Sequence, residues 1–238
     1  MKLINYCKQI LPIQTKQFIW LQGSAIKSLF LKRPKPDNRL AENLTQQILH
    51  SMSGWTDVTW RGLPILKFPT DLWSYYEILR DTEPDLIIEI GTHHGGSAVF
   101  FLDICGLLGL NTEIITVDIK RWEPTLEYHD MHRIIGSSLD PDVISRIDMA
   151  RKSYKKAMVV LDGDHHRLTV LKELQIYSKF VSKGCYLVAE DTCSQYADGG
   201  PGNAVQEFLQ ENKDNWTVDR SKERFALTTN PGGYLKKL

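Results

Sequence analysis

Short apolar segments alternate with longer helix-like segments over most of this chain, beginning at residue 85. Runs such as DLIIEIG are apolar almost throughout, which predicts strands that are buried on both faces of a sheet. The segments between them are long enough to form helices that carry the chain back across the sheet. The predicted parallel strands are residues 85–91, 113–119, 133–138, 157–162 and 185–191, with helices at 95–109, 140–152, 167–181 and 203–212.

This order of elements predicts an α/β fold with a Rossmann-like, doubly wound, mostly parallel sheet. Segments 216–220 and 224–230 are close enough in sequence to pair as an antiparallel C-terminal hairpin, which brings the sheet to seven strands. Ligands in such sheets bind beyond the carboxyl ends of the strands. Polar residues at those ends are therefore the first candidates for a functional site.

The N-terminal segment differs from the rest of the chain in its charge. Residues 1–36 carry seven Lys or Arg residues and no acidic residue, and their apolar positions suit one or two amphipathic helices. We therefore divide the chain into a basic arm with a linker, residues 1–50, and a catalytic domain, residues 51–238. The arm is expected to pack on the domain or on a sister subunit in a homo-oligomer. Because Phe18 and Trp20 lie among lysines, a peripheral membrane contact is the alternative.

The overall composition excludes several classes of protein. Lys+Arg and Asp+Glu both number 29, a balance that gives no sign of nucleic-acid binding. The four cysteines lack metal-binding spacing, and no apolar run reaches the roughly 20 residues that span a bilayer. The N-terminus also lacks the apolar core of a signal peptide. These features favour a cytoplasmic protein, or one at the inner membrane face if the arm binds lipid.

Acidic residues follow two of the predicted strands directly. Asp162 ends the strand before LDGDHH, and Glu190 and Asp191 end the strand before AEDT. Because parallel strands end at one edge of a sheet, three carboxylates are expected to converge there. Carboxylate oxygens without thiolate partners favour Mg²⁺ or Mn²⁺. Asp164 is a candidate for a supporting partner or an alternative ligand.

Two histidines stand beside the first of these acids. His165 lies three residues after Asp162 and can face the same crevice, where an imidazole suits the role of general base. His166 is its rival, and the residue pattern alone does not separate them.

A glycine-rich turn, EIGTHHGGS, follows the first predicted strand and suggests a nucleotide-like cofactor. Glycine lets the backbone approach a ligand closely, and the next helix offers free N–H groups at its N-terminus. Asp118 ends the second strand, where an acid can accept both ribose hydroxyls of an adenosine. Glu89 would repel a pyrophosphate but suits the ammonium of S-adenosylmethionine. The candidate cofactor-binding residues at these strand ends are Glu89, Gly91, Thr92, Gly95, Asp118, Ser137, Ser138 and Asp162.

Several motifs occur together in an order that resembles a known family. From about Leu66 to the C-terminus the chain contains KFPTDLWSYYEIL, IIEIGTHHGGSAVFF, TVDI, GSSLDP, VVLDGDHH, YLVAEDT, DGGPGNAVQEFL and NPGGYL. This stretch resembles the cephalosporin hydroxylase / rhamnosyl O-methyltransferase family, whose fold is that of class I S-adenosylmethionine-dependent methyltransferases. The resemblance implies Mg²⁺ ligands at Asp162, Glu190 and Asp191, a base at His165, and cofactor contacts at Glu89, Gly91, Ser97 and Asp118.

We therefore expect an O-methyltransferase that uses S-adenosylmethionine and Mg²⁺ or Mn²⁺. The family acts on hydroxyls of sugars, glycolipids and small natural products, so a small hydroxyl acceptor is implied as the partner. Three alternatives remain open. They are a catalytically silent binding protein with this fold, a nicotinamide-dependent oxidoreductase, and a non-haem iron hydroxylase, whose sites usually need two histidines.

Overall fold

The computed structural model describes residues 38–238, apart from 52–53, 55, 125, 127 and 194–195. The described residues form one compact unit from Asn38 to Leu238. Its first helix, α3 (Asn38–Ser51), precedes a small antiparallel pair, β1 (Thr59–Trp60) and β2 (Leu63–Pro64). The predictions for residues 1–36, including oligomer and membrane contacts, lie outside the described residues.

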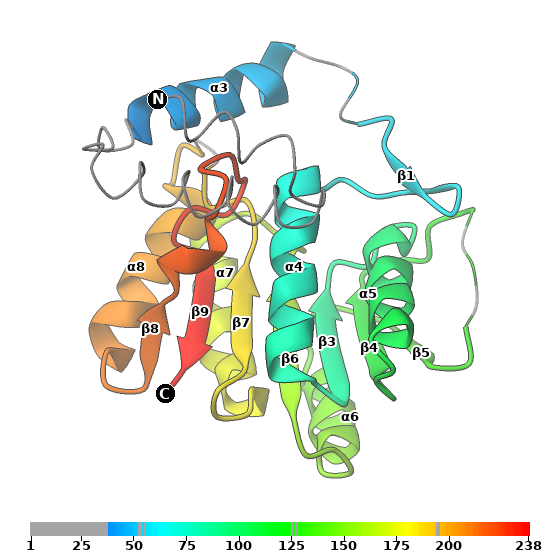
Figure 1. Ribbon diagram of the computed structural model, residues 1–238. Helices are drawn as coiled ribbons and strands as arrows, with labels where there is room; N and C mark the ends of the chain where they lie inside the picture. Colours follow the sequence, from blue (N-terminus) through cyan, green and yellow to red (C-terminus); the bar gives the residue numbers. More distant parts are fainter. Residues whose placement is uncertain (1–37, 52–53, 55, 125, 127, 194–195) are drawn as a thin grey trace, which may run out of the picture. The chain divides into compact units, whose positions relative to one another are not determined.

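A seven-stranded mixed sheet forms the centre of this unit, as predicted (Figure 1). Its order is β5-β4-β3-β6-β7-β9-β8, and the first five strands run parallel. β9 is antiparallel to both of its neighbours. The strands are β3 (Leu86–Ile90), β4 (Glu113–Asp118), β5 (Met131–Ile135), β6 (Ala157–Leu161), β7 (Tyr186–Ala189), β8 (Trp216–Val218) and β9 (Tyr234–Lys237).

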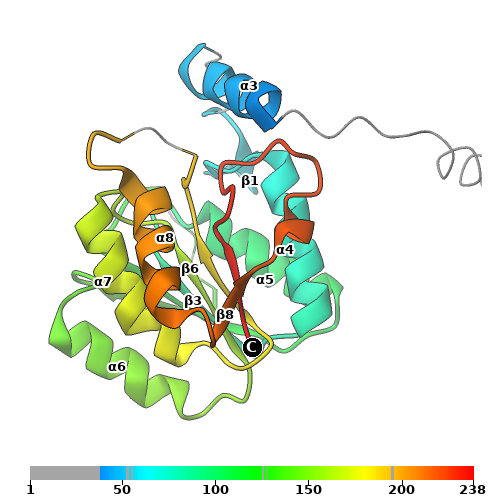
Figure 2. The ribbon, with the colours of Figure 1, turned by 90° about the vertical axis from the view of Figure 1, so that its left-hand side faces the viewer.

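Helices cover both faces of the sheet, which explains why the central strands are apolar on both sides. Figure 2 shows α4 and α5 on one face and α6, α7 and α8 on the other. No described helix is long and apolar enough to cross a membrane. The helices are α4 (Pro69–Thr82), α5 (Gly96–Leu107), α6 (Pro141–Arg151), α7 (Arg167–Tyr177) and α8 (Gly200–Asn212), with short 3₁₀ turns η2 (Ser178–Phe180) and η3 (Arg220–Lys222).

The C-terminal hairpin is antiparallel, but the prediction for its second strand was wrong. β8 pairs with residues 234–237, not with 224–230. Segment 224–230 instead binds the buried carboxylate of Asp71 on α4. Asp71 accepts hydrogen bonds from the Thr228 hydroxyl and from both the backbone N–H and the hydroxyl of Thr229. The backbone N–H of Thr229 binds Asp71, whereas in a sheet backbone N–H groups bond to a neighbouring strand.

Gly91 allows two neighbouring strand ends to approach closely. It follows β3 with φ of 96°, and a Cβ atom there would lie 1.9 Å from the backbone oxygen of Asp162. On the same side, Asp162 N–H donates to the carbonyl of Ile90 at 2.8 Å. Because Gly91 has no side chain, the backbone of Asp162 can lie directly against the end of β3.

We expect Gly91→Ala to lower the free energy of unfolding by more than about 2 kcal/mol, because it adds both backbone strain and a clash with main-chain atoms. Gly106→Ala is the matched control. A Cβ atom at Gly106, on α5, meets nothing within 4 Å, so alanine should stabilise the helix by up to about 1 kcal/mol. Urea unfolding of both variants checks this. Equal stability of Gly91→Ala and the unaltered protein would contradict the close approach.

Candidate active site

A cavity of about 670 Å³ opens at the carboxyl ends of the parallel strands. Most of its walls come from the residues that follow β3, β4, β5, β6 and β7, the edge predicted from the sequence, and residues 64–67 and Thr229 complete them. The candidate residues that line it are Gly91, Thr92, Ser97, Asp118, Ser137, Ser138, Asp162, Asp164, His165 and Asp191. Within the described part of the chain, Glu89, Gly95 and Glu190 lie outside this lining.

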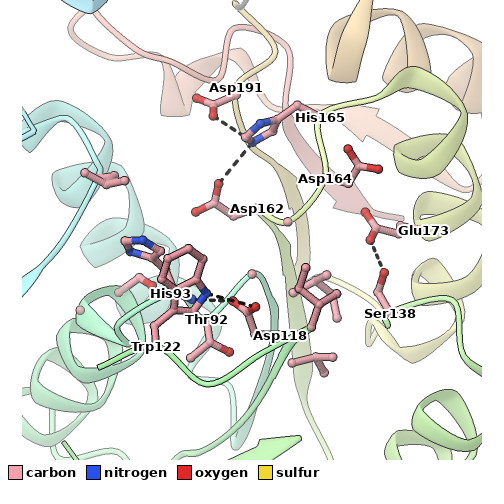
Figure 3. Close-up of a pocket in the computed structure, with 18 of the residues that line it drawn as sticks. Thr92, His93, Asp118, Trp122, Ser138, Asp162, Asp164, His165, Glu173 and Asp191 are labelled. Carbon is pink, nitrogen blue, oxygen red and sulfur yellow. Dashed lines mark hydrogen bonds and ion pairs between the residues drawn. The ribbon is translucent and has the colours of Figure 1, made fainter. Parts of the chain in front are cut away.

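Asp162, His165 and Asp191 converge at the top of the cavity in Figure 3. One ligand atom from each lies within 4.8 Å of the others, so together they can hold a metal ion. His165 Nε2 is 3.1 Å from Asp191 Oδ2 and 3.9 Å from Asp162 Oδ1. Two carboxylates beside an imidazole form a donor set that fits a hard divalent cation.

The carboxylates of Asp162 and Asp191 raise the pKa of His165 to about 10, although burial acts in the opposite direction. A protonated imidazole cannot act as a base. The charge on these two carboxylates therefore controls whether His165 can accept a proton. His166 differs, because its side chain is 81% exposed and pairs with Asp164 at 2.6 Å.

Glu190 and Asp191 are adjacent in sequence but face different partners. Asp191 adopts a left-handed backbone conformation with φ of 55°, and its N–H donates to Asn230 Oδ1 at 2.9 Å. Asp191 thus faces His165. Glu190 is buried and accepts a hydrogen bond from the Tyr75 hydroxyl. Glu190, the predicted third metal ligand, is therefore not part of the Asp162–His165–Asp191 cluster in this structure.

Lys67 is the principal residue of the site that the sequence analysis missed. Its ammonium lies 2.8 Å from Asp162 Oδ2 and 2.7 Å from Glu190 Oε1, with a side chain only 2% exposed. Burial alone would lower the pKa of Lys67, but the charges of Asp162 and Glu190 raise it. A single lysine within the apolar run ILKFP was the available signal. A lysine there buries its charge, which requires acidic partners.

Asp118 is held rigidly on the opposite side of the cavity from His165. Its Oδ2 accepts the N–H of His93 at 2.8 Å, and its Oδ1 accepts from Trp122 Nε1 at 3.3 Å (Figure 3). Trp122 also packs against His93, with ring centroids 4.6 Å apart and the ring planes tilted by 53°. The loop after β4 thus contributes an aromatic wall to the cavity through Trp122.

Glu89 is fully buried beneath the glycine-rich turn. Its two carboxylate oxygens accept hydrogen bonds from the hydroxyls of Ser97 and Thr116. Burial raises the pKa of Glu89 to about 7. Ser97 itself lines the cavity, so Glu89 contacts the cavity wall through this serine. A direct contact between Glu89 and a cofactor stays a prediction.

Glu173, on α7, is a second lining residue that the sequence analysis missed. It is 1% exposed, and burial raises the pKa of its carboxyl to about 7 from an ordinary value of 4.5. A carboxyl with a higher pKa in the folded chain than in the unfolded chain binds its proton more tightly when folded. Its contribution to stability is therefore present at low pH and is lost as the pH rises from about 4.5 to about 7.

Glu173→Gln should accordingly make the free energy of unfolding less dependent on pH. We expect the decrease in stability between about pH 5 and about pH 8 to shrink by about 2 kcal/mol, as measured by urea unfolding at both values. Glu211→Gln, at an exposed position on α8, is the control and should leave the dependence unchanged. Parallel pH curves for Glu173→Gln and the unaltered protein would show that Glu173 titrates normally.

Comparison with known proteins identifies the chain. The family described as Rhamnosyl O-methyltransferase/CmcI matches residues 52–238. The chain belongs to this family. It is similar to the rhamnosyl O-methyltransferase of Mycobacterium tuberculosis, with 33% identity over 192 residues that cover 76% of this chain and 78% of the relative. The Mycobacterium leprae protein of the same name is 31% identical over 191 residues, which cover 76% of this chain and 83% of the relative.

Solved structures of CmcI share the fold of this Rhamnosyl O-methyltransferase/CmcI family member. One, described with Mg and SAM, has a TM-score of 0.61 at 19% identity and covers 87% of this chain and 88% of its own. An apo structure has a TM-score of 0.62 at 22% identity and covers 87% of each chain. Family and relatives together make the protein an S-adenosylmethionine-dependent O-methyltransferase. This excludes the oxidoreductase and hydroxylase alternatives.

Proposed function

We propose that the enzyme transfers the methyl group of S-adenosylmethionine to a hydroxyl of a sugar, a glycolipid or a small natural product, with the help of Mg²⁺ or Mn²⁺. The observation that carries this proposal is the convergence of Asp162, His165 and Asp191 on one cavity with Asp118. The name of the mycobacterial relatives supports a sugar acceptor.

The cofactor is expected to lie across the strand ends. Asp118, fixed by His93 and Trp122, is placed to accept the ribose hydroxyls. Thr92 and Ser97, which belong to the glycine-rich turn, line the side of the cavity where the amino-acid end of the cofactor would lie. Asp162 borders this side and the cation cluster, so it belongs to both subsites.

Asp162 and Asp191 offer the oxygens for the cation, with Glu190 as the third predicted ligand if it leaves Lys67. A bound divalent cation supplies charge that lowers the pKa of an acceptor hydroxyl. His165 would take the proton from that hydroxyl once a cation offsets the charges of Asp162 and Asp191, which raise the pKa of the imidazole and keep it protonated. The remaining contribution of the protein is orientation, which holds the acceptor oxygen in line with the methyl group.

Alanine variants of the two neighbouring histidines test the base. His165→Ala should lower the rate of methyl transfer by about 10²- to 10⁴-fold, because general bases contribute about this much. His166→Ala is the matched control, since its exposed side chain pairs with Asp164 away from the cluster. We would measure transfer of the methyl group from labelled S-adenosylmethionine to a panel of rhamnosides and other glycosides. A larger loss in His166→Ala would assign the base to His166 instead.

A further inference from the structure

The carboxyl group of Glu173 is built into the cavity wall with one oxygen left without a partner. Ser138 Oγ donates a hydrogen bond to Oε1 at 2.5 Å. Oε2 is buried and has no hydrogen-bond partner among the described residues. Glu173 lines the same cavity as Asp118 and Asp162. Ser138 thus fixes the carboxyl in the cavity wall, and Oε2 lacks a partner among the described residues.

An unpaired buried carboxylate oxygen is costly, and native proteins pair nearly all such groups. The rest of α7 shows that the position could have been apolar, because Val170 and Leu174 on the same helix are buried in the core. A charged group retained at such a position indicates a ligand that donates a hydrogen bond to it. The ligand would recover the free energy that burial of Glu173 costs.

The position of Glu173 indicates which part of the cofactor it meets. Asp118 marks the ribose, and the methyl group must point toward the acceptor beside His165. The adenine ring of the cofactor then extends toward the loop after β5, which supplies Ser137 and Ser138 to the cavity. Figure 3 shows Ser138 and Glu173 across the cavity from Thr92 and Trp122. Ile119 is 74% exposed and lines this space, as a face for an aromatic base would.

We propose that Glu173 Oε2 accepts a hydrogen bond from the exocyclic amine of adenine and so selects adenosyl cofactors against inosyl ones. This inference rests on the proposed binding of S-adenosylmethionine in the cavity. Adenine carries its exocyclic amine, a hydrogen-bond donor, where hypoxanthine carries a carbonyl oxygen, which is an acceptor. Two acceptors would then face each other in a buried site, which is unfavourable.

The test compares two cofactor products that differ only at this edge, S-adenosylhomocysteine and S-inosylhomocysteine. Isothermal titration at about pH 8 keeps Glu173 largely ionised. We expect the unaltered protein to bind the adenosyl compound at least about 30-fold more tightly. In Glu173→Gln the amide can rotate to present either its oxygen or its NH₂ group, so the two affinities should fall within about threefold of each other. Glu211→Gln, exposed on α8, should keep the full preference.

Each outcome has a separate meaning. Equal affinities in the unaltered protein, or an unchanged preference in Glu173→Gln, would overturn the inference. If Glu173 instead met the ammonium of the cofactor, the variant would lose affinity for both compounds equally, and 5′-methylthioadenosine, which lacks that ammonium, would bind both proteins alike. Failure of the unaltered protein to bind S-adenosylhomocysteine at all would refute the proposed cofactor site itself. Urea unfolding of Glu173→Gln verifies that the variant is folded.

Discussion

Asp162→Asn should lower the rate of methyl transfer by about 10³-fold or more while the protein stays folded. The carboxylate of Asp162 lies between the ammonium of Lys67 and the imidazole of His165, with one oxygen near each. Asparagine keeps the size of the side chain but removes the charge that would hold a cation. Electrostatic contributions of this kind are commonly worth several kcal/mol of barrier.

Two measurements separate a metal role from a general loss of structure. Turnover would be measured with saturating S-adenosylmethionine, and Mn²⁺ binding would be followed by electron paramagnetic resonance. We expect Mn²⁺ affinity and turnover to fall together in Asp162→Asn. Asp148→Asn is the control, because Asp148 pairs with Lys152 at the surface of α6 and does not line the cavity. Undiminished turnover in Asp162→Asn, or in the unaltered enzyme treated with EDTA, would remove the cation from the mechanism.

Asp71→Ala is expected to have the largest effect on folding, a loss of about 4 kcal/mol in the free energy of unfolding. Asp71 is 1% exposed and also accepts a hydrogen bond from the Tyr234 hydroxyl at 2.8 Å. Its removal takes the carboxylate acceptor from three hydroxyls and leaves the backbone N–H of Thr229 buried without its partner, although the Thr229 hydroxyl keeps Asn230 Oδ1 at 3.0 Å. Asp148→Ala, at a surface position 47% exposed, is the control and should change stability by less than about 1 kcal/mol.

The loss in Asp71→Ala should reach the active site as well. Thr229 lines the cavity, and its neighbour Asn230 binds the backbone of Asp191. We therefore expect weaker Mn²⁺ binding even at temperatures where the variant is folded. Chemical denaturation and Mn²⁺ titration check the two effects. A variant as stable as the unaltered protein would show that segment 224–230 is held by other contacts.

The sequence was sufficient to predict the central strands β3, β6 and β7, because a strand buried on both faces needs an unbroken apolar run. The edge strand β5 contains His132 and Arg133, so its start at Met131 was missed and the predicted segment 133–138 ran past its end. The position of Asp162, His165 and Asp191 followed, since parallel strands end at one edge. The second strand of the hairpin was not predictable in this way. Segments 224–230 and 234–237 both follow β8 closely in the sequence, and the contacts of Thr228 and Thr229 with Asp71 decide between them.

Other parts of the site depend on contacts between residues distant in sequence. Lys67 meets partners 95 residues or more away, and a lone lysine gives no indication of which acids it will meet. The orientation of Glu190 was also hidden, because adjacent acids look equivalent until the backbone conformation of Asp191 is known. Glu173 resembles an ordinary helix residue in the sequence, and its burial becomes evident only when α7 packs on the sheet.

The ammonium of Lys67 between Asp162 and Glu190 has a practical consequence for work with this enzyme. The ammonium of Lys67 is a positive charge that belongs to the protein. It partly balances the negative charges of Asp162 and Glu190 when no metal ion is bound. We therefore expect the side chains of the site to keep their arrangement when a chelator removes the metal ion. The enzyme is therefore suited to metal-exchange experiments, in which one preparation is emptied and then reloaded with different divalent ions to compare their reactivity.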